Sequence, residues 1–572
     1  MTLPPPASSP ATDAAASLLA ELVAHGVRDL VLSPGSRSQA LALAAVRLAG
    51  TGVLRVHVRI DERVAGFTAL GLGRETGVPA AVLCTSGTAA ANLLPAAMEA
   101  FHAGVPLLLL TADRPPELRG IGANQATAQP DMFAPWVREG IDAPVPGDAV
   151  PDAWSGLAAR AVAISLGADA PHGLPGVAGP VHLNLPAREP LSGEPVVVDV
   201  TPGAAPVPAP GEPVVLARGP RTVVIAGADA GADAEEIAHA GSWPLIAEIV
   251  SGARFGRQLV HGYRTLLRRS DLGGAVERAV VLGHPTLSRE VAALLARPDV
   301  EVIAVRRGGE ELDLNHRSHT AASVVVAAPT GGDDRASDRA SERAWLGAWL
   351  TASAEQAVDL SEQAPDHDGL ASTDSATRRD AVKAELDAVR RPLDRRLLVD
   401  AVWRATWPHD RLMFGSSRLV RVADTVLGGK KVPVHANRGL AGIDGTIATA
   451  TGIALASQAG GAPGVTRVLL GDLTLLHDVG ALLLPPDETE PRLQVIVGND
   501  GGGTIFDGLE VAQVAPAADL DRAFYTPHQV RLEQLALAYG WEYQRVTTRT
   551  ALDQVLTRPV GGRQLIEVPL AR

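Results

Sequence analysis

Cysteine is nearly absent from the 572-residue sequence, which contains only Cys84. A single thiol cannot form an intrachain disulfide, and this one lies in an apolar run typical of a strand, AAVLC. A signal-peptide pattern is also missing, because the start, MTLPPPASSPATDAAA, has neither a basic segment nor an apolar core. We therefore expect a protein of the reducing cytoplasm.

Long apolar runs and an excess of basic residues are absent as well. No run reaches the roughly 18 residues that suggest a membrane span, so none is expected. The formal net charge is −13, with 51 basic against 64 acidic residues. Nucleic acids and anionic membrane surfaces both demand a basic footprint, so neither is an expected partner. Small anionic substrates would then need local arginine pockets.

The length bounds the number of domains. At 572 residues the chain is too long for one hydrophobic core, and about 150 residues per domain suggests three or four domains. A hydrophobic content of 46% with 20% charged residues is typical of a globular protein with a large core. The pattern along the chain fits three domains better than four.

Residues 1–190 alternate helical patterns with short apolar runs. These runs are DLVLSPGS, AVLCTSGT, PLLLLTADRP and GPVHLNLP. The alternation predicts parallel strands joined by crossover helices. Each run ends in polar or turn-forming residues, which gathers polar groups at the carboxyl ends of the strands. That edge is where open α/β sheets bind ligands.

Residues 191–390 begin with a Pro-rich stretch from Val200 to Pro213, which indicates an extended linker. A second unit follows, with the strand-like runs TVVIAGADA, WPLIAEIV, AVVLGHP and VEVIAVRR. From Thr330 to Asp380 the composition turns to Ala, Ser, Asp and Arg. This composition predicts exposed helix mixed with a mobile connection.

Residues 391–572 return to strand-like runs that end in polar turns, namely DRLMFGSS, VPVHANRG, TRVLLGD and RLQVIVGND. The same pattern as in the first unit predicts another parallel sheet. We therefore predict an α/β protein of three domains with mainly parallel sheets, bounded at 1–190, 191–390 and 391–572.

Two strand-like runs of the third unit stop at oxygen-bearing residues. VLLGD ends at Asp472, and VIVGNDGGG places Asn499 and Gly501 one helix later. A carboxylate and an amide oxygen on adjacent strand ends, with a loop carbonyl and ligand phosphates, can bind a hard cation such as Mg²⁺. A helix starting near Leu473 would point its amino end at those phosphates. Taken alone, the same residues also fit simple turns.

Glu62 lies in RIDERVAG, between a strand-like run and a helical pattern from Ala65 to Arg74. Taken alone, it fits a carboxylate at a helix amino terminus. Its surroundings in the chain favour a functional role.

Several segments carry a family resemblance. SPGSRSQALALAA, DERVAG, TSGTAAANLLPAAMEA and TADRPPELRGIGANQATAQPDMF occur in this order over about a hundred residues. They resemble the pyrimidine-binding domain of the 2-succinyl-5-enolpyruvyl-6-hydroxy-3-cyclohexene-1-carboxylate (SEPHCHC) synthase family, part of the thiamine-diphosphate-dependent superfamily. GSSRLVR, ANRGLAGIDGT, GDLTLLHD and GNDGGGTIF resemble its diphosphate-binding domain. The resemblance covers nearly the whole chain, with weaker matches in the middle domain and around 330–380.

The resemblance implies a thiamine-diphosphate-binding fold with thiamine diphosphate as cofactor. Glu62 matches the catalytic glutamate that hydrogen-bonds the cofactor's pyrimidine ring and favours its imino tautomer. Ile443 matches the apolar wedge that bends the cofactor, although it also fits a core isoleucine. The residues implied to bind the cofactor are Pro34, Glu62, Thr85, Ser86, Ile443, Gly471, Asp472, Leu473, Asn499, Gly501, Thr504 and Ile505.

The resemblance also implies Mg²⁺, or alternatively Mn²⁺, held by Asp472, Asn499 and the carbonyl of Gly501. Leu473 stands where many relatives have Gly, and Asp500 where a second Asn is usual. Neither change removes a ligand, so metal binding is still expected.

The family's substrates, 2-oxoglutarate and isochorismate, are both carboxylates. Arginines suit such anions because the planar guanidinium binds them bidentately. Without the family match an arginine is more often a surface or ion-pair residue. Arg289 also fits an ordinary helix, and Phe506 also fits simple packing. The residues implied to bind substrate are Ser36, Arg37, Arg114, Asn124, Gln125, Arg289, Ser417, Arg421, Arg438 and Phe506.

The reaction implied is decarboxylation of 2-oxoglutarate and 1,4-addition of the succinyl carbanion equivalent to isochorismate, in menaquinone biosynthesis. The cofactor is implied to lie between domains of two chains, in a homodimer or homotetramer with shared active sites. Two alternatives stay open. One is another thiamine-diphosphate enzyme, such as an acetolactate synthase or a 2-oxo acid decarboxylase. The other is a catalytically silent cofactor-binding paralogue, against which Glu62, Asp472 and Asn499 argue.

Overall fold

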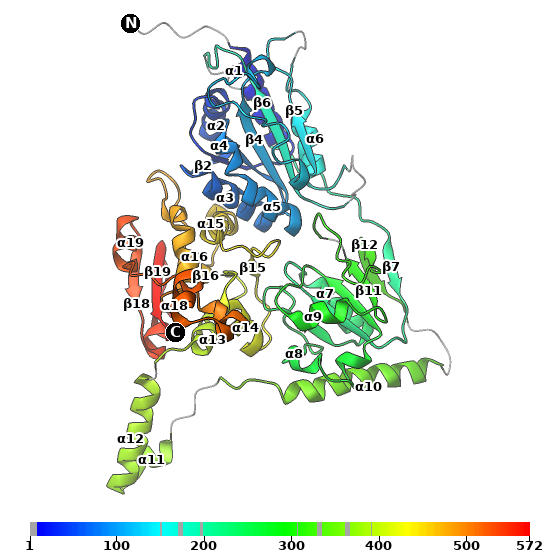
Figure 1. Cartoon of the computed structure of the whole chain (residues 1–572), viewed down its shortest axis with the longest axis vertical. Helices are drawn as coiled ribbons and strands as arrows, with labels where there is room; N and C mark the ends of the chain where they lie inside the picture. Colours follow the sequence, from blue (N-terminus) through cyan, green and yellow to red (C-terminus); the bar gives the residue numbers. More distant parts are fainter. Residues whose placement is uncertain are drawn as a thin grey trace.

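A computed structural model describes residues 9–148, 152–169, 176–194, 198–305, 307–328, 334–360, 366–390 and 392–572. Three units follow one another along the chain, each built around a parallel sheet (Figure 1). This arrangement confirms the predicted α/β class with mainly parallel sheets. Within the described ranges no helix is both long and apolar enough to cross a membrane.

The first unit contains a six-stranded parallel sheet in the order β2-β1-β3-β4-β6-β5. Its strands are β1 Asp29–Leu32, β2 Arg55–Val58, β3 Ala80–Cys84, β4 Leu107–Asp113, β5 Glu139–Asp142 and β6 Pro180–Pro186. Its helices are α1 Pro10–Ala24, α2 Gln39–Gly50, α3 Glu62–Thr76, α4 Thr88–Ala91, α5 Leu94–Ala103 and α6 Leu157–Ser165. Strands β3 and β4 are buried at every position, because helices cover both faces of the sheet.

The middle unit contains a five-stranded parallel sheet in the order β12-β11-β10-β8-β9 and a separate parallel pair, β13-β7. Its strands are β7 Pro213–Leu216, β8 Thr222–Ala226, β9 Leu245–Ala247, β10 Arg278–Leu282, β11 Glu301–Val305, β12 His319–Ala321 and β13 Ser323–Val326. Its helices are α7 Asp233–Gly241, α8 Tyr263–Leu266, α9 Arg289–Leu295 and α10 Asp334–Ala354.

The predicted linker has no regular structure between residues 200 and 212, and Pro213 already begins β7. It does not run free in solvent, because the amide of Gly203 donates a hydrogen bond to the carbonyl of Val23 at the end of α1.

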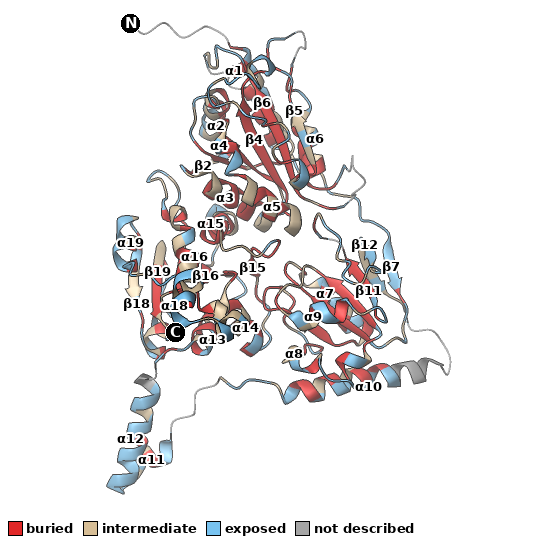
Figure 2. Cartoon of the chain, viewed as in Figure 1, coloured by how far each residue is buried: buried red, intermediate tan, exposed pale blue. Residues whose placement is uncertain are grey.

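The connection between the middle and third units is only partly the exposed helix that was predicted. On α10, Trp345 and Trp349 are buried in the core of the middle unit, so an exposed helix was the wrong prediction there. The charge-rich composition of this segment gave no indication that these two tryptophans would be buried. Helices α11 His367–Ala371 and α12 Ser375–Arg390 are largely exposed (Figure 2). The predicted mobile connection falls partly on 329–333 and 361–365, which lie outside the described residues.

The third unit repeats the strand order of the first, as β15-β14-β16-β17-β19-β18, again all parallel. Its strands are β14 Arg411–Phe414, β15 Val434–Ala436, β16 Thr466–Gly471, β17 Leu493–Asn499, β18 Glu542–Arg545 and β19 Arg563–Pro569. Its helices are α13 Arg395–Ala405, α14 Arg418–Val426, α15 Thr446–Ser457, α16 Asp472–His477, α17 Val511–Val514, α18 Ala517–Leu520, α19 Leu532–Ala538 and α20 Arg549–Thr557.

Helices α3 and α15 join the first unit to the third (Figure 1). Their backbones approach so closely that a Cβ on Gly71 would lie 2.0 Å from the carbonyl oxygen of Thr449. A Cβ on Gly452 would lie 2.1 Å from the carbonyl oxygen of Thr68. Glycine is therefore required on both helices, and the contact fixes the helix that begins at Glu62 against the third unit.

Candidate active site

Asp472 and Asn499 lie next to each other at the carboxyl edge of the third sheet. Strands β16 and β17 pair in parallel with Gly471 opposite Gly498. The residues that follow this pair are Asp472 on one chain segment and Asn499 on the other. Helix α16 begins directly at Asp472. The predicted adjacency of these two residues is therefore observed, together with the helix amino end beside them.

The carboxylate of Asp472 is buried, with 2% of the residue exposed. Burial raises its pKa, and nearby Asp500 acts in the same direction, while a hydrogen bond with His528 opposes them. His528 Nε2 lies 2.8 Å from Asp472 Oδ2. The amide oxygen of Asn499 accepts a hydrogen bond from Gly501 N at 3.1 Å, and its amide nitrogen donates to Glu567 at 2.8 Å.

This edge fits a hard cation. It offers a buried carboxylate oxygen, an amide oxygen and loop carbonyls, which are the ligands such cations prefer. A Cβ on Gly471 or Gly501 would meet no atom within 4 Å, so space is open beside both. Among the described residues no group of three or more His, Cys, Asp and Glu could hold a metal. The predicted set contains only one such residue, Asp472, and relies on oxygen from an amide and from the backbone.

Asp500 has a use inside the loop that follows β17. Its carboxylate accepts hydrogen bonds from Arg395 at 2.6 Å and from the hydroxyl of Thr504 at 2.5 Å. The aspartate that departs from the family pattern thus anchors the loop. Farther along the loop, Phe506 packs edge-to-face against Phe524 with ring centroids 5.4 Å apart.

Glu62 is the first residue of α3 and is half-buried. The helix is capped by Asp61, whose carboxylate accepts hydrogen bonds from the amides of Arg63 and Val64. The Glu62 carboxylate itself makes no hydrogen bond or ion pair with any described residue. Burial and then the Glu62 charge raise the pKa of the Cys84 thiol, which places Glu62 beside the carboxyl end of β3.

Arg37 and Arg114 lie close together at the carboxyl edge of the first sheet. Burial lowers the pKa of Arg37, and the neighbouring Arg114 lowers it further. Arg37 pairs at 3.9 Å with the exposed Glu189 and donates to the carbonyl of Ala187 at 3.4 Å. The nearby Asp113 charge acts on the pKa of Arg37 in the opposite direction to Arg114. Arg114 is buried and donates to the hydroxyl of Ser86 at 3.4 Å. Two adjacent guanidinium groups that are not fully compensated by carboxylates could bind an anion.

Ser86 connects this pair to the loop that carries Asn124 and Gln125. Its hydroxyl donates to the carbonyl of Gln125 at 3.0 Å, and the Gln125 amide donates to the carbonyl of Ser86 at 2.8 Å. Gln125 has a φ of 58°, a left-handed conformation that these bonds stabilise. Asn124 is exposed beside it. A residue predicted to bind cofactor thus contacts residues predicted to bind substrate.

The carboxyl ends of β1 and β3 lie side by side in the first sheet. A Cβ on Gly35 would lie 2.3 Å from Thr85 Cβ, so Pro34 and Ser36 are brought next to Thr85. The Thr85 hydroxyl is buried and has no hydrogen-bond partner. Pro34 and Ser36 are exposed. An unpaired buried hydroxyl at this edge fits a site that a ligand completes.

Ser417, Arg421 and Arg438 belong to the carboxyl edge of the third sheet, after β14 and β15. Ser417 caps α14, and Arg421 donates to its carbonyl at 3.0 Å. Burial lowers the pKa of Arg421, and nearby Arg264 lowers it further. Arg438 is buried, with 2% of the residue exposed.

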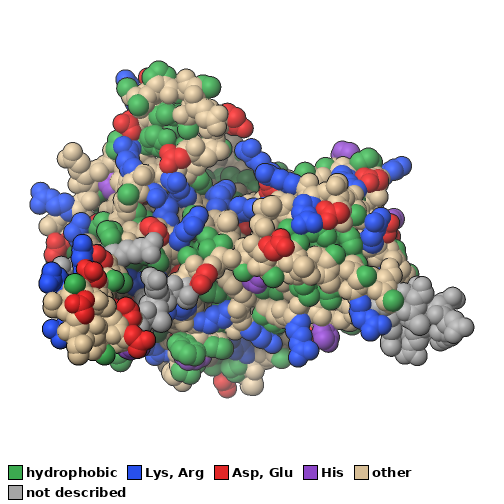
Figure 3. Space-filling view, turned by 90° about the horizontal axis from the view of Figure 1, so that it is seen from below, with side chains coloured by type: hydrophobic (Ala, Val, Ile, Leu, Met, Phe, Trp, Pro, Cys, Tyr) green, Lys and Arg blue, Asp and Glu red, His purple; other side chains and the backbone are tan. Residues whose placement is uncertain are grey.

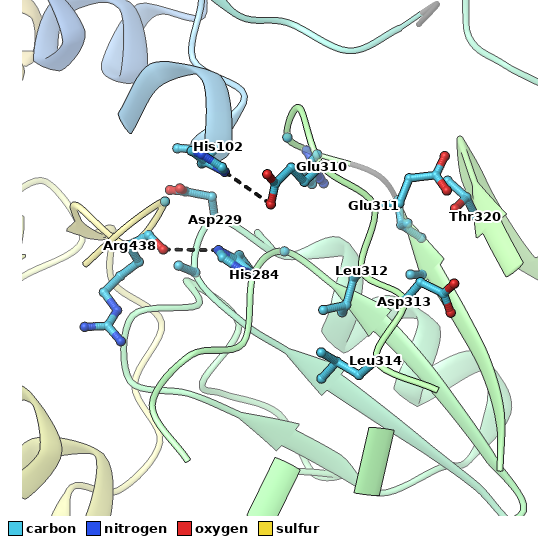
Figure 4. A pocket seen from close by; sticks show the side chains of 18 residues that line it. His102, Asp229, His284, Glu310, Glu311, Leu312, Asp313, Leu314, Thr320 and Arg438 are labelled. Carbon is cyan, nitrogen blue, oxygen red and sulfur yellow. Dashed lines mark hydrogen bonds and ion pairs between the residues drawn. The ribbon is translucent and has the colours of Figure 1, made fainter. Parts of the chain in front are cut away.

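Arg438 also borders a cavity of about 270 Å³ between the three units. His284 Nδ1 donates to the Arg438 carbonyl at 3.1 Å, and His102 pairs with Glu310 across the same cavity (Figure 4). The Arg438 guanidinium points away from this cavity (Figure 4).

Ile443 lies on the loop before α15 and is half-buried. It joins none of the apolar clusters of the described core, in contrast to an ordinary core isoleucine.

Arg289 is the one predicted substrate residue that belongs to the middle unit. It begins α9 in the middle unit, and its side chain is 80% exposed. Its ion pair is with Glu510 of the third unit at 3.7 Å.

Glu62 and Asp472 are not linked directly. They lie on different units and share no hydrogen bond or ion pair in the described structure.

Sequence reasoning missed several residues that contact the candidate site. His528 had no local signal, because it lies in an irregular loop far along the chain from Asp472. Thr286 directly follows the strand-like run AVVLGHP and could have been noted as a polar residue after a strand. Glu248, the residue after β9, lies within the mainly apolar run WPLIAEIV and gave no signal of its own.

Comparison with known proteins gives concordant results. Residues 12–133 match the family described as thiamine pyrophosphate enzyme, N-terminal TPP binding domain. A 2-succinyl-5-enolpyruvyl-6-hydroxy-3-cyclohexene-1-carboxylate synthase of Leifsonia xyli subsp. xyli is 53% identical over 99% of this chain and 98% of its own length. The enzymes of that name from Clavibacter michiganensis and Mycobacterium avium are 52% and 37% identical, each over 99% of this chain and 97% of its own length.

A solved structure, benzoylformate decarboxylase from Polynucleobacter necessarius, aligns over 98% of both chains with a TM-score of 0.65 and 15% sequence identity. At that identity the likeness concerns the fold alone. The sequence similarity extends over nearly the full length of several relatives that carry one name. The chain belongs to the SEPHCHC synthase family.

Proposed function

We propose that this chain uses thiamine diphosphate to decarboxylate 2-oxoglutarate and to add the succinyl unit to isochorismate in a 1,4 sense, in menaquinone biosynthesis. The relatives named for SEPHCHC synthesis support the activity, and the family match at residues 12–133 supports the cofactor. The observation that carries the proposal is the adjacency of Arg37 and Arg114, because such a pair suits an anionic substrate. Arg and Lys side chains also gather near the middle of one face (Figure 3), despite the acidic net charge.

The first unit, within 1–190, is assigned to the pyrimidine end of the cofactor and the third, within 391–572, to its diphosphate. When bound, the cofactor would supply a nucleophilic carbon for the 2-oxo group and a cationic ring that accepts the electron pair released by decarboxylation. Glu62 holds a proton at the pyrimidine ring, a role that suits a carboxylate without a partner in the chain. Ile443 supports the cofactor from its apolar side. Thr85 and Ser86 are assigned to the same end as Glu62.

A divalent cation, Mg²⁺ or alternatively Mn²⁺, is assigned to Asp472, Asn499 and the carbonyl of Gly501. The paired strand ends support this assignment, since they put a carboxylate and an amide oxygen side by side. Around the diphosphate we place Gly471, Leu473, Thr504 and Ile505 with these ligands.

The substrate carboxylates are assigned to Arg37, Arg114, Arg421 and Arg438. Ser36, Asn124, Gln125, Ser417 and Phe506 are assigned to the same space. Arg289 stays the weakest member of the predicted set, because its side chain is 80% exposed and pairs with Glu510.

The active enzyme is proposed to be a homodimer or homotetramer of the cytoplasm. Glu62 and Asp472 lie on different units and share no hydrogen bond or ion pair in the described chain. The family resemblance implies that a second copy completes each site. The nearly cysteine-free sequence fits a reducing compartment.

The direct test is to incubate the purified protein with 2-oxoglutarate, isochorismate, thiamine diphosphate and Mg²⁺ and to identify the product by mass. The expected product has the summed mass of the two substrates less one carbon dioxide. Reactions without isochorismate, or with pyruvate in place of 2-oxoglutarate, serve as controls. Turnover of 2-oxoglutarate to an aldehyde alone would indicate a 2-oxo acid decarboxylase, and no turnover at all a silent paralogue.

A further inference from the structure

The guanidinium of Arg438 is held by a residue of the middle unit. Its Nε donates to the Thr286 hydroxyl at 2.9 Å, and its Nη2 donates to the Thr286 carbonyl at 3.1 Å. Its Nη1 donates to Ser416 at 3.3 Å. The Nε–Nη2 edge of the planar guanidinium is thus occupied by Thr286, and Nη1 and Nη2 each keep one further N–H that could be donated to a carboxylate.

The position of Thr286 is set in turn by the side chain of Glu248. Glu248, the residue after β9, accepts hydrogen bonds from the amide of Thr286 at 3.1 Å and from the amide of Leu287 at 2.7 Å. Each of its two oxygens takes a different amide, so one side chain sets the position of two successive residues. Glu248 is fully buried, and burial, followed by the Asp424 charge, raises its pKa to about 8.

The main chain around Arg438 is clamped as well. Glu99 of the first unit accepts hydrogen bonds from the amides of Gly439 at 2.8 Å and Leu440 at 2.9 Å. His284 of the middle unit bonds the Arg438 carbonyl, so the main chain at Arg438 and the two following residues is held from both the first and the middle unit. The direction of the guanidinium then depends on its bonds to Thr286 and Ser416.

We propose that Glu248 and Thr286 are positioning residues for substrate binding. Thr286 orients the Arg438 guanidinium so that its Nη1–Nη2 edge receives a substrate carboxylate, and Glu248 holds Thr286 in place. The middle unit, which has no assigned cofactor contact, thereby contributes to substrate recognition. Burying a polar side chain is costly unless its oxygens are hydrogen-bonded, and for Glu248 the two successive amides of Thr286 and Leu287 supply those bonds. This inference rests on the proposed function.

The first variants to compare are Thr286→Val and Thr286→Ser. Valine keeps the β-branched shape and removes the hydroxyl, whereas serine keeps the hydroxyl. Thr286→Val should raise the KM of one carboxylate substrate roughly tenfold, the size expected for losing a hydrogen bond to a charged group. Thr286→Ser should restore the wild-type KM. The affinity for thiamine diphosphate, measured by calorimetry, should be unchanged in both.

Glu248→Gln tests the supporting step, because an amide offers only one acceptor oxygen for two amide donors. It should raise the same KM by roughly fivefold, less than the direct loss at Thr286. Placed on an Arg438→Ala background, it should add no further change in KM, since it acts only through Arg438. The matched control is Glu342→Gln, another buried glutamate of the middle unit, whose bond is with Arg218.

The inference is overturned if Thr286→Val leaves both KM values unchanged, or if Glu248→Gln changes KM equally with and without Arg438. A parallel loss of thiamine diphosphate affinity and thermal stability would also overturn it, because it would indicate general packing. If Glu248→Gln does not fold, the Thr286 pair decides. A wild-type protein that forms no product would instead refute the proposed function, and this is seen before any variant is compared.

Discussion

The imidazole of His528 lies 2.8 Å from the carboxylate of Asp472, at the point where β16 ends. These residues come from distant parts of the third unit, yet they meet at the one carboxylate assigned to the cation. If Asp472 binds the cation as proposed, His528 would hold its carboxylate in place, as residues bonded to metal ligands commonly do.

Asp472→Ala should abolish Mg²⁺-supported binding of thiamine diphosphate, because the cation loses its only charged protein ligand. Calorimetric titration with the cofactor at low Mg²⁺ measures this. Asp507→Asn is a control on the neighbouring loop, where Asp507 pairs with Arg418 at 2.6 Å and lies beside Tyr525. Equal affinities of wild type and Asp472→Ala for thiamine diphosphate would indicate that the segments around Asp472 and Asn499 are only turns.

Arg37→Ala and Arg114→Ala should each weaken substrate use by roughly 1.5–3 kcal/mol, the contribution of a charge-assisted hydrogen bond. Cofactor affinity should stay intact. Because the two guanidinium groups repel each other, Arg37→Ala should leave the melting temperature unchanged or raise it.

Arg268→Ala is the surface control for this pair, since its side chain is 75% exposed and bonded to Glu290. KM values for both substrates, with calorimetry for the cofactor, provide the comparison. If Arg37→Ala and Arg114→Ala behave like Arg268→Ala, the pair has a structural role.

Dilution should lower the specific activity by dissociating the assembly. Because each proposed site needs Glu62 from one copy and Asp472 from another, specific activity should fall as sedimentation shows dissociation to monomers. Added thiamine diphosphate and Mg²⁺ should shift the assembly back. A species with full activity at monomer mass would refute the shared site.

Asp478 should make folding stability depend on pH. Its carboxylate is buried and accepts hydrogen bonds from the amides of Ile447 and Ala448 at the start of α15. Burial raises its pKa from 3.8 to about 7. Between these values the folded state keeps a proton that the unfolded state has lost, so this group's contribution to stability falls as pH rises.

Asp478→Asn should remove this part of the pH dependence, roughly 1.4 kcal/mol for each pH unit across the window. Urea denaturation of both proteins at several pH values between 4 and 7 measures the difference. An unchanged difference in unfolding free energy across these pH values would contradict the assignment to Asp478.

Much of the parallel-sheet architecture could be predicted because apolar runs end in polar turns. The ends of β16 and β17 needed only local sequence, since parallel pairing of neighbouring runs puts Asp472 beside Asn499. Strand β19 was missed although it lies between β17 and β18, because its sequence, RQLIEVP, mixes polar and apolar residues. Its Glu567 bonds Asn499, which explains a polar residue in a central strand.

The contacts around the site could not be predicted in the same way. Thr286 and Arg438 are separated by about 150 residues, and only the packing of two units brings them together. The exposure of Arg289 was also beyond local sequence, because the residue begins a helix whose apolar side is buried. Tertiary packing decides such contacts, and the family resemblance supplied the roles but not the distances.

Glu62 is the residue on which the proposed chemistry depends most. It begins α3 without acting as its cap, since Asp61 takes that role, and its carboxylate has no partner in the described chain. Glu62→Gln keeps the shape and a hydrogen-bonding group but removes the carboxylate, so cofactor affinity should change little. Turnover should fall strongly.

The decisive measurement is the rate at which the C2 proton of bound thiamine diphosphate exchanges with deuterated water, followed by rapid-quench proton NMR. Glu62→Gln should exchange this proton much more slowly than the wild type while it binds the cofactor with similar affinity. Exchange at the wild-type rate would contradict the role of Glu62 and leave it a carboxylate at the start of a helix.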